Sequence, residues 1–231
     1  VITHSMKKAM EQISEANAKI DDNQRKSSLH FDGESFVEGQ EDLQKEVRNI
    51  KRELSTEQGI TEPTKAREAL GKALHAVQDY YSHSNWIETY PSGGINSNLG
   101  VAGVSLSELP PTTPTCNDAG TCNCSSGACN NLLPLQLMIT SGYYRSSKVK
   151  QDHEKKTGKC SHGGASDISS VNGIGINKDV RWCYVSPHEY LHNNAADRAK
   201  TATEYFINNV VKPEQTRAMV GAIATARGRR W

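Results

Sequence analysis

The sequence predicts a mainly α-helical domain that carries a long, disulfide-stapled loop insertion. Apolar residues recur at helical spacing early in the chain and again near its end, and no alternating strand pattern stands out. From about residue 90 to 184, Gly, Ser, Pro, Asn and Cys replace that periodicity. We therefore expect a single domain over 1–231 with a Cys-rich insertion at about 90–184. Since the chain lacks an initial Met and stops at "ARGRRW", we also expect a piece of a longer protein.

Three amphipathic helices are expected before the insertion. The motif "HFDGE" (30–34) separates the first from the second, and Thr61 and Pro63 suit the start of the third. The apolar stripes that predict them are Met6, Met10, Ile13 and Ile20; Leu43, Val47, Ile50 and Leu54; and Ala66, Leu70, Ala73, Leu74, Val77 and Tyr81.

Further helices are expected in the second half of the chain. "NNLLPLQLM" (130–138) predicts a short helix inside the insertion. Ser186 and Glu189 have the spacing of a capping box, with Pro187 in the first turn, so a long helix is predicted from residue 186. A last helix is expected after Pro213.

Composition narrows the function classes. The chain is 35% hydrophobic and 23% charged, with a formal net charge of +1, which fits a globular domain and argues against nucleic acid as a partner. No window reaches the roughly 18 apolar residues that a membrane-spanning helix needs. We expect no transmembrane segment.

Six cysteines favour an extracellular, secreted protein with disulfide bonds. Four lie between residues 116 and 129, where the sequence is too polar to build a core. A zinc knuckle is the alternative, but no CxxC pair is present. Pairing of Cys160 with Cys183 is the simplest guess, and Cys122 and Cys124 are expected to join different partners. The tripeptide "NCS" at Asn123 matches a glycosylation acceptor.

Histidine and aspartate recur at steps of four on the third predicted helix. His75, Asp79 and His83 share one face of a helix, and His188 and His192 have the same spacing later in the chain. His75 and His83 are about 12 Å apart along a helix, too far to bind one zinc ion. The pattern predicts at least two metal ions with Asp79 between them; solvated surface histidines are the alternative.

Several motifs together resemble a known family. "HFDGE", "ALHAVQDYYSHSNWIE", "GKCSHGG", "GINKD" and "LHNNAADRAKTAT" are similar to Het-C-type domains, and most of all to the amino-terminal domains of the animal von Willebrand factor A domain-containing protein 7 family. These domains are remotely similar to the zinc-dependent phospholipases C and single-strand nucleases. The resemblance implies a phospholipase C/nuclease-like helical bundle and a cluster of two or three zinc ions.

The resemblance also assigns roles to individual residues. It implies zinc ligation by His4, Asp21, His30, His75, Asp79, His83, His188 and His192, with Asp22 as a competitor of Asp21 and with Asp21 and Asp79 as the catalytic carboxylates. In the similar enzymes an amino-terminal tryptophan binds one zinc ion, whereas this chain begins with Val1. The closing pair is also HxxxH instead of HxxxE, and both departures affect the third zinc site.

Two functions of different classes follow. Three zinc ions with two aspartates carry +6 and −2, an excess of about four positive charges that would attract a phosphate group. The first function is therefore a secreted phosphodiesterase, with a phospholipid favoured over nucleic acid as substrate because no stacking platform is evident. The second is a non-catalytic extracellular module for assembly or adhesion to protein partners, whose metal cluster is structural or vestigial.

Overall fold

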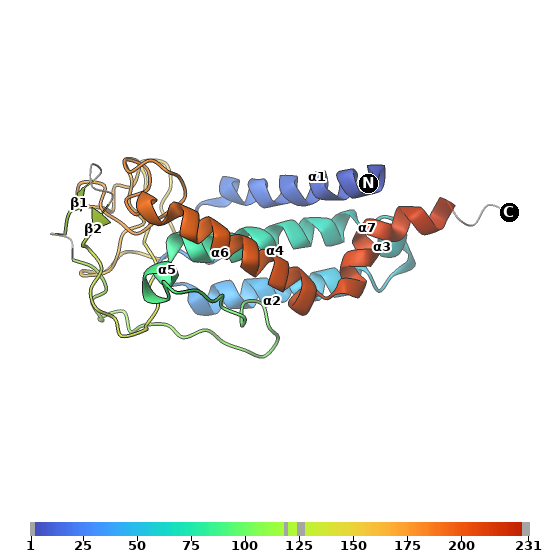
Figure 1. Ribbon diagram of the computed structural model, residues 1–231, viewed down its shortest axis with the longest axis horizontal. Coiled ribbons are helices and arrows are strands. Elements are labelled where there is room, and N and C mark those ends of the chain that lie inside the picture. The colour runs from blue at the N-terminus through green and yellow to red at the C-terminus, as the bar shows by residue number, and fades with distance from the viewer. Residues whose placement is uncertain (1–2, 118–119, 124–127, 228–231) are drawn as a thin grey trace.

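A computed structural model describes residues 3–117, 120–123 and 128–227. Long helices lie along one axis, and the loops gather at one end of the bundle, away from the C-terminus (Figure 1). The elements are α1 (His4–Ala18), η1 (Lys19–Asn23), η2 (Ser27–Leu29), α2 (Phe36–Glu53), α3 (Glu57–Thr61), α4 (Thr64–His83), α5 (Trp86–Thr89), β1 (Cys122–Asn123), β2 (Ala128–Cys129), η3 (Glu189–Leu191), α6 (His192–Tyr205), η4 (Phe206–Val211) and α7 (Pro213–Arg227). The prediction of a mainly helical chain is confirmed.

Helix α4 is the centre of the bundle and packs against α1, α2 and α6. Every residue of its predicted apolar stripe is buried. Gly71 lets α1 approach closely, because a β-carbon there would lie 2.4 Å from the backbone oxygen of Ile13. The central position of α4 places the His75–His83 segment inside the molecule.

Helix α1 buries a different face from the one that its methionines predicted. The side chains of Met6 and Met10 are 37% and 58% exposed, whereas Ala9 and Ala16 are buried. Small residues allow the close approach that Gly71 permits on the facing helix. The helix itself was predicted correctly, and Ile13 and Ile20 of the predicted stripe do face inward, whereas Met6 and Met10 do not.

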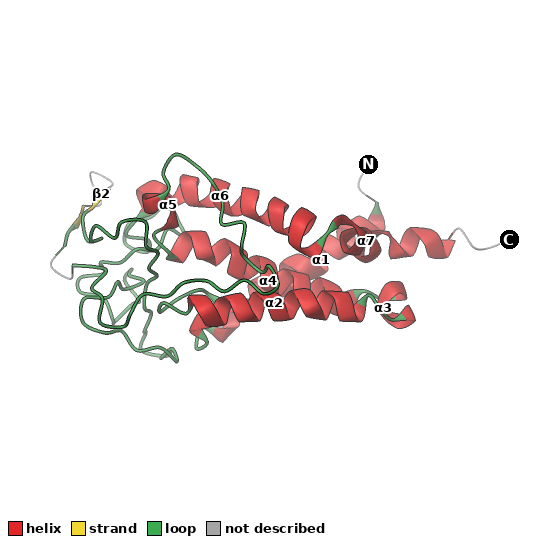
Figure 2. Cartoon of the chain, turned by 90° about the horizontal axis from the view of Figure 1, so that it is seen from below, coloured by secondary structure: helices red, strands yellow, loops and turns green. Residues whose placement is uncertain are grey.

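The insertion between α5 and η3 contains only β1 and β2 as regular structure among its described residues. Most of its loops lie at one end of the helices, but its first part runs along α2, where the Gln44 amide donates to the backbone oxygens of Val101 and Val104 (Figure 2). Asn96 holds its beginning against α4: its backbone N–H donates to the Tyr81 hydroxyl at 2.9 Å, and its side-chain amide donates to Tyr80 at 3.0 Å. The insertion therefore forms a cap on one end of the bundle, a position that its composition did not predict.

Disulfide bonds join Cys116 to Cys160 and Cys122 to Cys129. The predicted pairing of Cys160 with Cys183 is wrong, because Cys160 reaches back to the start of the Cys-rich stretch. Cys124, expected to join a different partner from Cys122, lies outside the described residues. Asn123 is exposed on β1, but the next two residues of its acceptor tripeptide also lie outside them.

Two helix predictions in the second half of the chain are wrong: one helix is absent and the other begins later than predicted. Residues 130–138 form no helix; Leu132 pairs with Cys116 in an isolated bridge, and Leu137 has a φ of 71°. The helix predicted from residue 186 begins instead as the short η3 and becomes α-helical only at His192. The helix after Pro213 is confirmed. Among the described residues, no helix combines the length and apolarity needed to cross a membrane.

Candidate metal centre

A polar cavity of about 470 Å³ opens where the C-terminal half of α4 meets η1 and the insertion. Its walls hold aspartates and histidines from four segments of the chain. The motif "HFDGE" lies beneath it, in an unusual conformation: Phe31 and Glu34 have φ values of 52° and 65°, although neither is glycine. This turn sends its histidine and its aspartate to two different groups of side chains.

The first group, here called the Asp79 group, consists of Asp21, His30, His75 and Asp79. Asp79 Oδ2 lies 2.8 Å from His75 Nε2 and 2.9 Å from His30 Nδ1, and those two nitrogens are 3.1 Å apart. Asp21 Oδ1, from the exposed η1, lies 3.7 Å from His75 Nε2. Four of the residues predicted as ligands therefore converge on one point.

The second group, here called the Asp179 group, consists of Asp32, His83, His162 and Asp179. Asp179 lies 3.0 Å from His83 Nε2 and 3.4 Å from His162 Nε2. Asp32 Oδ1 lies 3.0 Å from the other nitrogen of His83. The two imidazole rings contact each other edge to face at 4.6 Å.

The tautomers show what these groups can hold. His83 Nδ1 lies 3.0 Å from the backbone oxygen of His30, and His30 Nε2 lies 3.3 Å from the oxygen of Asn23. Since a carbonyl oxygen only accepts, these nitrogens carry the protons, and in the neutral rings the opposite nitrogens keep their lone pairs. Those lone pairs face the carboxylates of Asp79 and Asp179.

A lone pair that faces a carboxylate at 3 Å needs a proton or a metal ion between them. Four ligands at 2.0–2.1 Å from zinc stand about 3.3 Å from one another, close to the spacing within the Asp79 group. A backbone carbonyl that fixes the outer nitrogen is also typical of metal-bound histidine. The Asp79 and Asp179 groups thus fit two neighbouring zinc ions.

An orphaned oxygen supports the same fit. Asp32 Oδ1 is fully buried and, although it lies at ion-pair distance from His83, receives no hydrogen bond from any described residue. Its other oxygen accepts a hydrogen bond from Gln151 at 2.7 Å. A buried carboxylate oxygen without a donor is costly unless a cation lies nearby.

The charges of the cavity also call for cations. Each group contains two aspartates, and no lysine or arginine is among the described residues that line the cavity. Burial alone would raise the pKa of Asp79, but the charge of His83 and hydrogen bonds from His30 and His75 outweigh it and hold that pKa below its usual range. Histidine protons or metal ions are therefore the positive charges available to balance the aspartates.

The histidine pKa values move in the complementary direction. Burial would lower the pKa of His83, but Asp179, Asp32 and Asp79 together raise it well above its ordinary value. Burial would also lower the pKa of His30, but the hydrogen bond to Asp79 together with the charges of Asp79 and Asp32 raises it. A metal ion that binds here must displace protons, so binding releases them.

Three residues predicted as ligands lie elsewhere. His4 is exposed at the start of α1, about 20 Å of helix rise from η1. His188 precedes η3, so it does not share a helix face with His192; it contacts Glu88 and Asn131 instead. His192 Nδ1 lies 2.7 Å from the backbone oxygen of Lys178. The structure does not bring these histidines to either group.

Sequence reasoning missed Asp32 and Asp179 as members of the site, and it interpreted His162 as part of a loop held by Cys160 in preference to a further metal site with Asp167. All three lie inside motifs that carried the family resemblance, namely "HFDGE", "GKCSHGG" and "GINKD". Their signal was therefore present, but the spacing rule for helices does not apply to loop residues far apart in the chain.

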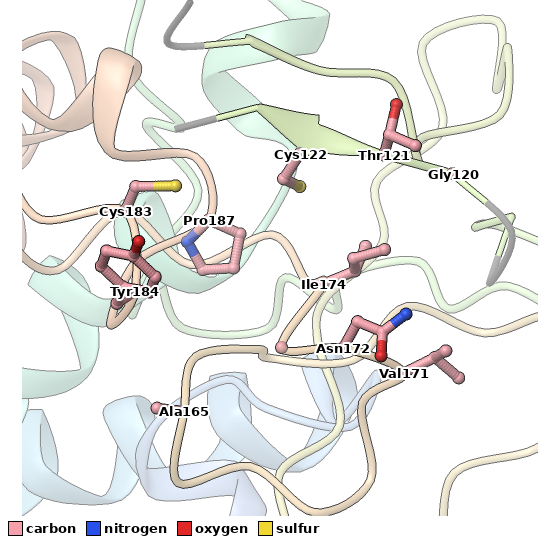
Figure 3. Close-up of a pocket in the computed structure, with 11 residues that line it drawn as sticks. Gly120, Thr121, Cys122, Ala165, Val171, Asn172, Ile174, Cys183, Tyr184 and Pro187 are labelled. Carbon is pink, nitrogen blue, oxygen red and sulfur yellow. The ribbon is translucent and has the colours of Figure 1, made fainter. Parts of the chain in front are cut away.

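The larger pocket of about 870 Å³ lies in the insertion, and its lining includes Cys122, Val171, Ile174, Tyr184 and Pro187 (Figure 3). No histidine, acidic or basic residue is among the described residues that line it. Since its described lining has no histidine, carboxylate or cation, its size does not make it the catalytic candidate.

Comparisons with known proteins decide the family. The model of the VWA7 N-terminal domain matches residues 1–219. This chain belongs to the VWA7 N-terminal domain family. It is 36% identical over 200 residues to von Willebrand factor A domain-containing protein 7 of Rattus norvegicus, and equally so to that of Mus musculus. The Homo sapiens protein is 36% identical over 201 residues.

The alignments cover most of this chain but only a small part of each relative. Each alignment covers 84% of this chain but 21% of the relative, so the chain spans about a fifth of their length. No solved structure matches the chain. The family assignment confirms the resemblance to the von Willebrand factor A domain-containing protein 7 family, whereas the more remote similarity to zinc enzymes stays a prediction.

Proposed function

We propose that this domain binds two zinc ions, one in the Asp79 group and one in the Asp179 group, and hydrolyses phosphate esters. The observation that carries the proposal is that three aspartates and three histidines line one cavity, with His30 and Asp32 buried behind them, and that no lysine or arginine is in its described lining. When bound, zinc supplies a nucleophilic water at neutral pH and stabilises negative charge on a phosphate.

The chain's own residues have distinct parts in this proposal. His30, His75 and Asp79 hold the first ion, and His83, His162 and Asp179 hold the second. Asp32 and the backbone oxygen of His30 orient the His83 ring. Asp21 has a side chain that is 65% exposed at the cavity, so it can accept a proton from an attacking water or complete the first ion's ligands.

Two zinc ions neutralise the aspartates of the site more closely than three zinc ions would. Their charge of +4 meets −4 from the four aspartates, so the excess of four positive charges disappears. A phosphate would then bind through direct contact with the ions and not through a strong long-range field. Two ions rather than three also suit the positions of His4, His188 and His192 outside the cavity.

The rival proposal is a non-catalytic extracellular module with a structural metal cluster. The helices and the stapled cap would then serve assembly or adhesion, and the zinc would hold the cap to α4. One feature favours this role: each group joins α4 to the insertion or to the "HFDGE" turn, so bound ions would stiffen that junction.

The experiment that separates these proposals measures metal and activity together. Zinc content of extensively dialysed protein is determined by elemental mass spectrometry, and bis(p-nitrophenyl) phosphate, phosphatidylcholine and single-stranded DNA are offered as substrates. Two zinc ions per chain with zinc-dependent hydrolysis would support the enzyme. Two ions without hydrolysis of any substrate would favour the structural role, and fewer than one ion would refute both.

A further inference from the structure

A second polar pocket, of about 380 Å³, lies beside the candidate metal centre. Arg145, Lys150 and Lys155 line it, and Glu154 is the one carboxylate among its described lining residues. This basic pocket is not evident from the formal net charge of +1, because the chain's charges nearly cancel overall. Locally, three cations face one anion.

Two of these cations are opposed in a way that costs stability. Arg145 and Lys150 pair across an antiparallel bridge, and like charges directly opposite one another are destabilising. The hairpin is well defined, since the Ser146 N–H donates to the oxygen of Val149 at 2.8 Å. An anion that binds between the two cations would remove this repulsion.

The existing partners compensate only part of the charge. Lys150 forms an ion pair with Glu154 at 2.5 Å. The Arg145 guanidinium has neither a hydrogen bond nor an ion pair with any described residue, although its backbone N–H and carbonyl anchor it to Asp167 and Ile168. A planar guanidinium on a fixed backbone is suited to bidentate binding of phosphate.

The basic pocket and the metal cavity share a wall. Tyr144 lines both, and its ring contacts the His162 ring at 5.4 Å. On the facing segment, Ser166 lines the metal cavity, whereas Ser169 lines the basic pocket. A ligand that crosses Tyr144 can therefore reach both.

We infer that the basic pocket binds a second phosphate group of the substrate whose ester is cleaved at the metal centre. The inference rests on the proposed function, because it takes the metal cavity as the site of cleavage. With the charge of the loaded metal centre nearly balanced, the basic pocket provides the attraction for an anionic substrate. The substrate class is thus a phosphodiester that carries an additional phosphate.

Binding is tested first, without any dependence on catalysis. Chelator-treated, metal-free protein is titrated with inorganic pyrophosphate by calorimetry. Wild type should bind, and Arg145→Ala with Lys150→Ala should weaken binding by about tenfold or more. Lys148→Ala is the matched control: it removes a cation from the same hairpin outside the pocket lining and should bind as wild type. Equal binding by all variants, or equal loss in the control, would overturn the inference.

Substrate preference is tested with the zinc-loaded protein. Thymidine 5′-(p-nitrophenyl phosphate) is compared with the same compound bearing a 3′-phosphate, and glycerophosphoinositol with its 4-phosphate. The extra phosphate should raise kcat/KM by about tenfold in at least one pair, which identifies the source, and not in the Arg145→Ala, Lys150→Ala variant. Hydrolysis of the parent compounds without a gain from the extra phosphate in either pair would overturn the inference.

The two tests also separate this inference from the proposed function. If no substrate is hydrolysed but pyrophosphate binding depends on Arg145 and Lys150, the proposed function fails and the phosphate site remains. Circular dichroism and zinc content that match wild type show that the double variant is folded. Lys150→Gln offers a milder change if the double variant does not fold.

Discussion

Two buried clusters of this domain are made of the same kinds of residue, yet only one fits a metal centre. In the Asp79 and Asp179 groups, histidine lone pairs face carboxylates across an open cavity that lacks a lysine or arginine in its described lining. Around His188, Glu88 accepts from both His188 at 2.6 Å and Lys178 at 3.0 Å. A permanent cation already balances the second cluster.

The comparison teaches that charge balance distinguishes a candidate site from a structural network better than residue type does. Lys178 also donates to the backbone oxygens of Ser84 and Ile176, both at 2.8 Å, so it is fixed in place. His188 contacts Asn131 with its second nitrogen at 2.9 Å and is 1% exposed. The Lys178 ammonium therefore supplies the positive charge that Glu88 needs in this cluster.

The largest effect should come from Asp79→Asn, which removes a carboxylate from the centre of its group. Loss of a residue that only hydrogen-bonds to a metal ligand lowers metal affinity by up to about 100-fold. Asp79 contacts two ligand nitrogens directly, so its loss should lower zinc affinity by more than about 100-fold. Hydrolysis should be lost with the metal. Elemental mass spectrometry measures the metal and phosphodiester assays measure the hydrolysis. Full metal content with full activity would contradict the assignment of the Asp79 group as a metal centre.

Asp32→Asn should have the next largest effect. This change keeps the shape but removes the charge beside His83, so zinc affinity should fall by about 10–100-fold. Competition with a chromogenic chelator measures it. Gln151 donates to the other oxygen of Asp32, so Gln151→Glu is a second probe. It replaces this hydrogen-bond donor with a carboxylate and should change the zinc affinity without altering Asp32 itself. An unchanged affinity in both variants would remove Asp32 from the site.

His188→Gln should lower stability and leave zinc binding unchanged. The loss of a buried hydrogen-bonded ring should cost about 1–3 kcal/mol in the free energy of unfolding, measured by urea titration. Chelator titration should give the wild-type zinc affinity within about twofold. A loss of zinc as large as in Asp79→Asn would show that the two clusters act as one site.

The smallest expected effect is a pH dependence that belongs to His188. Burial lowers the pKa of His188 more than Glu88 raises it. As the pH falls below about 6.5, the unfolded chain takes up a proton that folded His188 resists, so stability is lost. The His188→Gln variant should lose less stability between pH 7 and pH 5, by about 1.4 kcal/mol for each unit of pKa shift. Parallel curves for the two proteins would contradict this assignment.

The sequence predicted those parts of the domain that follow helical periodicity. The buried stripe of α4 and the approach of His75 to Asp79 both depend on residues four apart on one helix, which sequence spacing determines. His188 and His192 have the same spacing but fail, because the chain enters this segment through η3 and not an α-helix. Spacing therefore predicts a pair only where the helix is present.

The remainder depends on contacts between distant segments. His162 and Asp179 both come from the second half of the insertion, which the Cys116–Cys160 disulfide and backbone hydrogen bonds bring to α4. The inward face of α1 depends on Gly71 of another helix. No local pattern encodes such contacts, so motif resemblance was the only signal for these residues.

The left-handed backbone at Phe31 has a consequence for the spacing of the two metal groups. His30 and Asp32 are its neighbours, and each belongs to a different group. The ring of Phe31 is locked against α2, where a β-carbon on Gly39 would lie 2.6 Å from it. The separation of His30 from Asp32 is thus set by the dihedral angles of Phe31, whereas α4 sets the separation of His75 and Asp79 from His83.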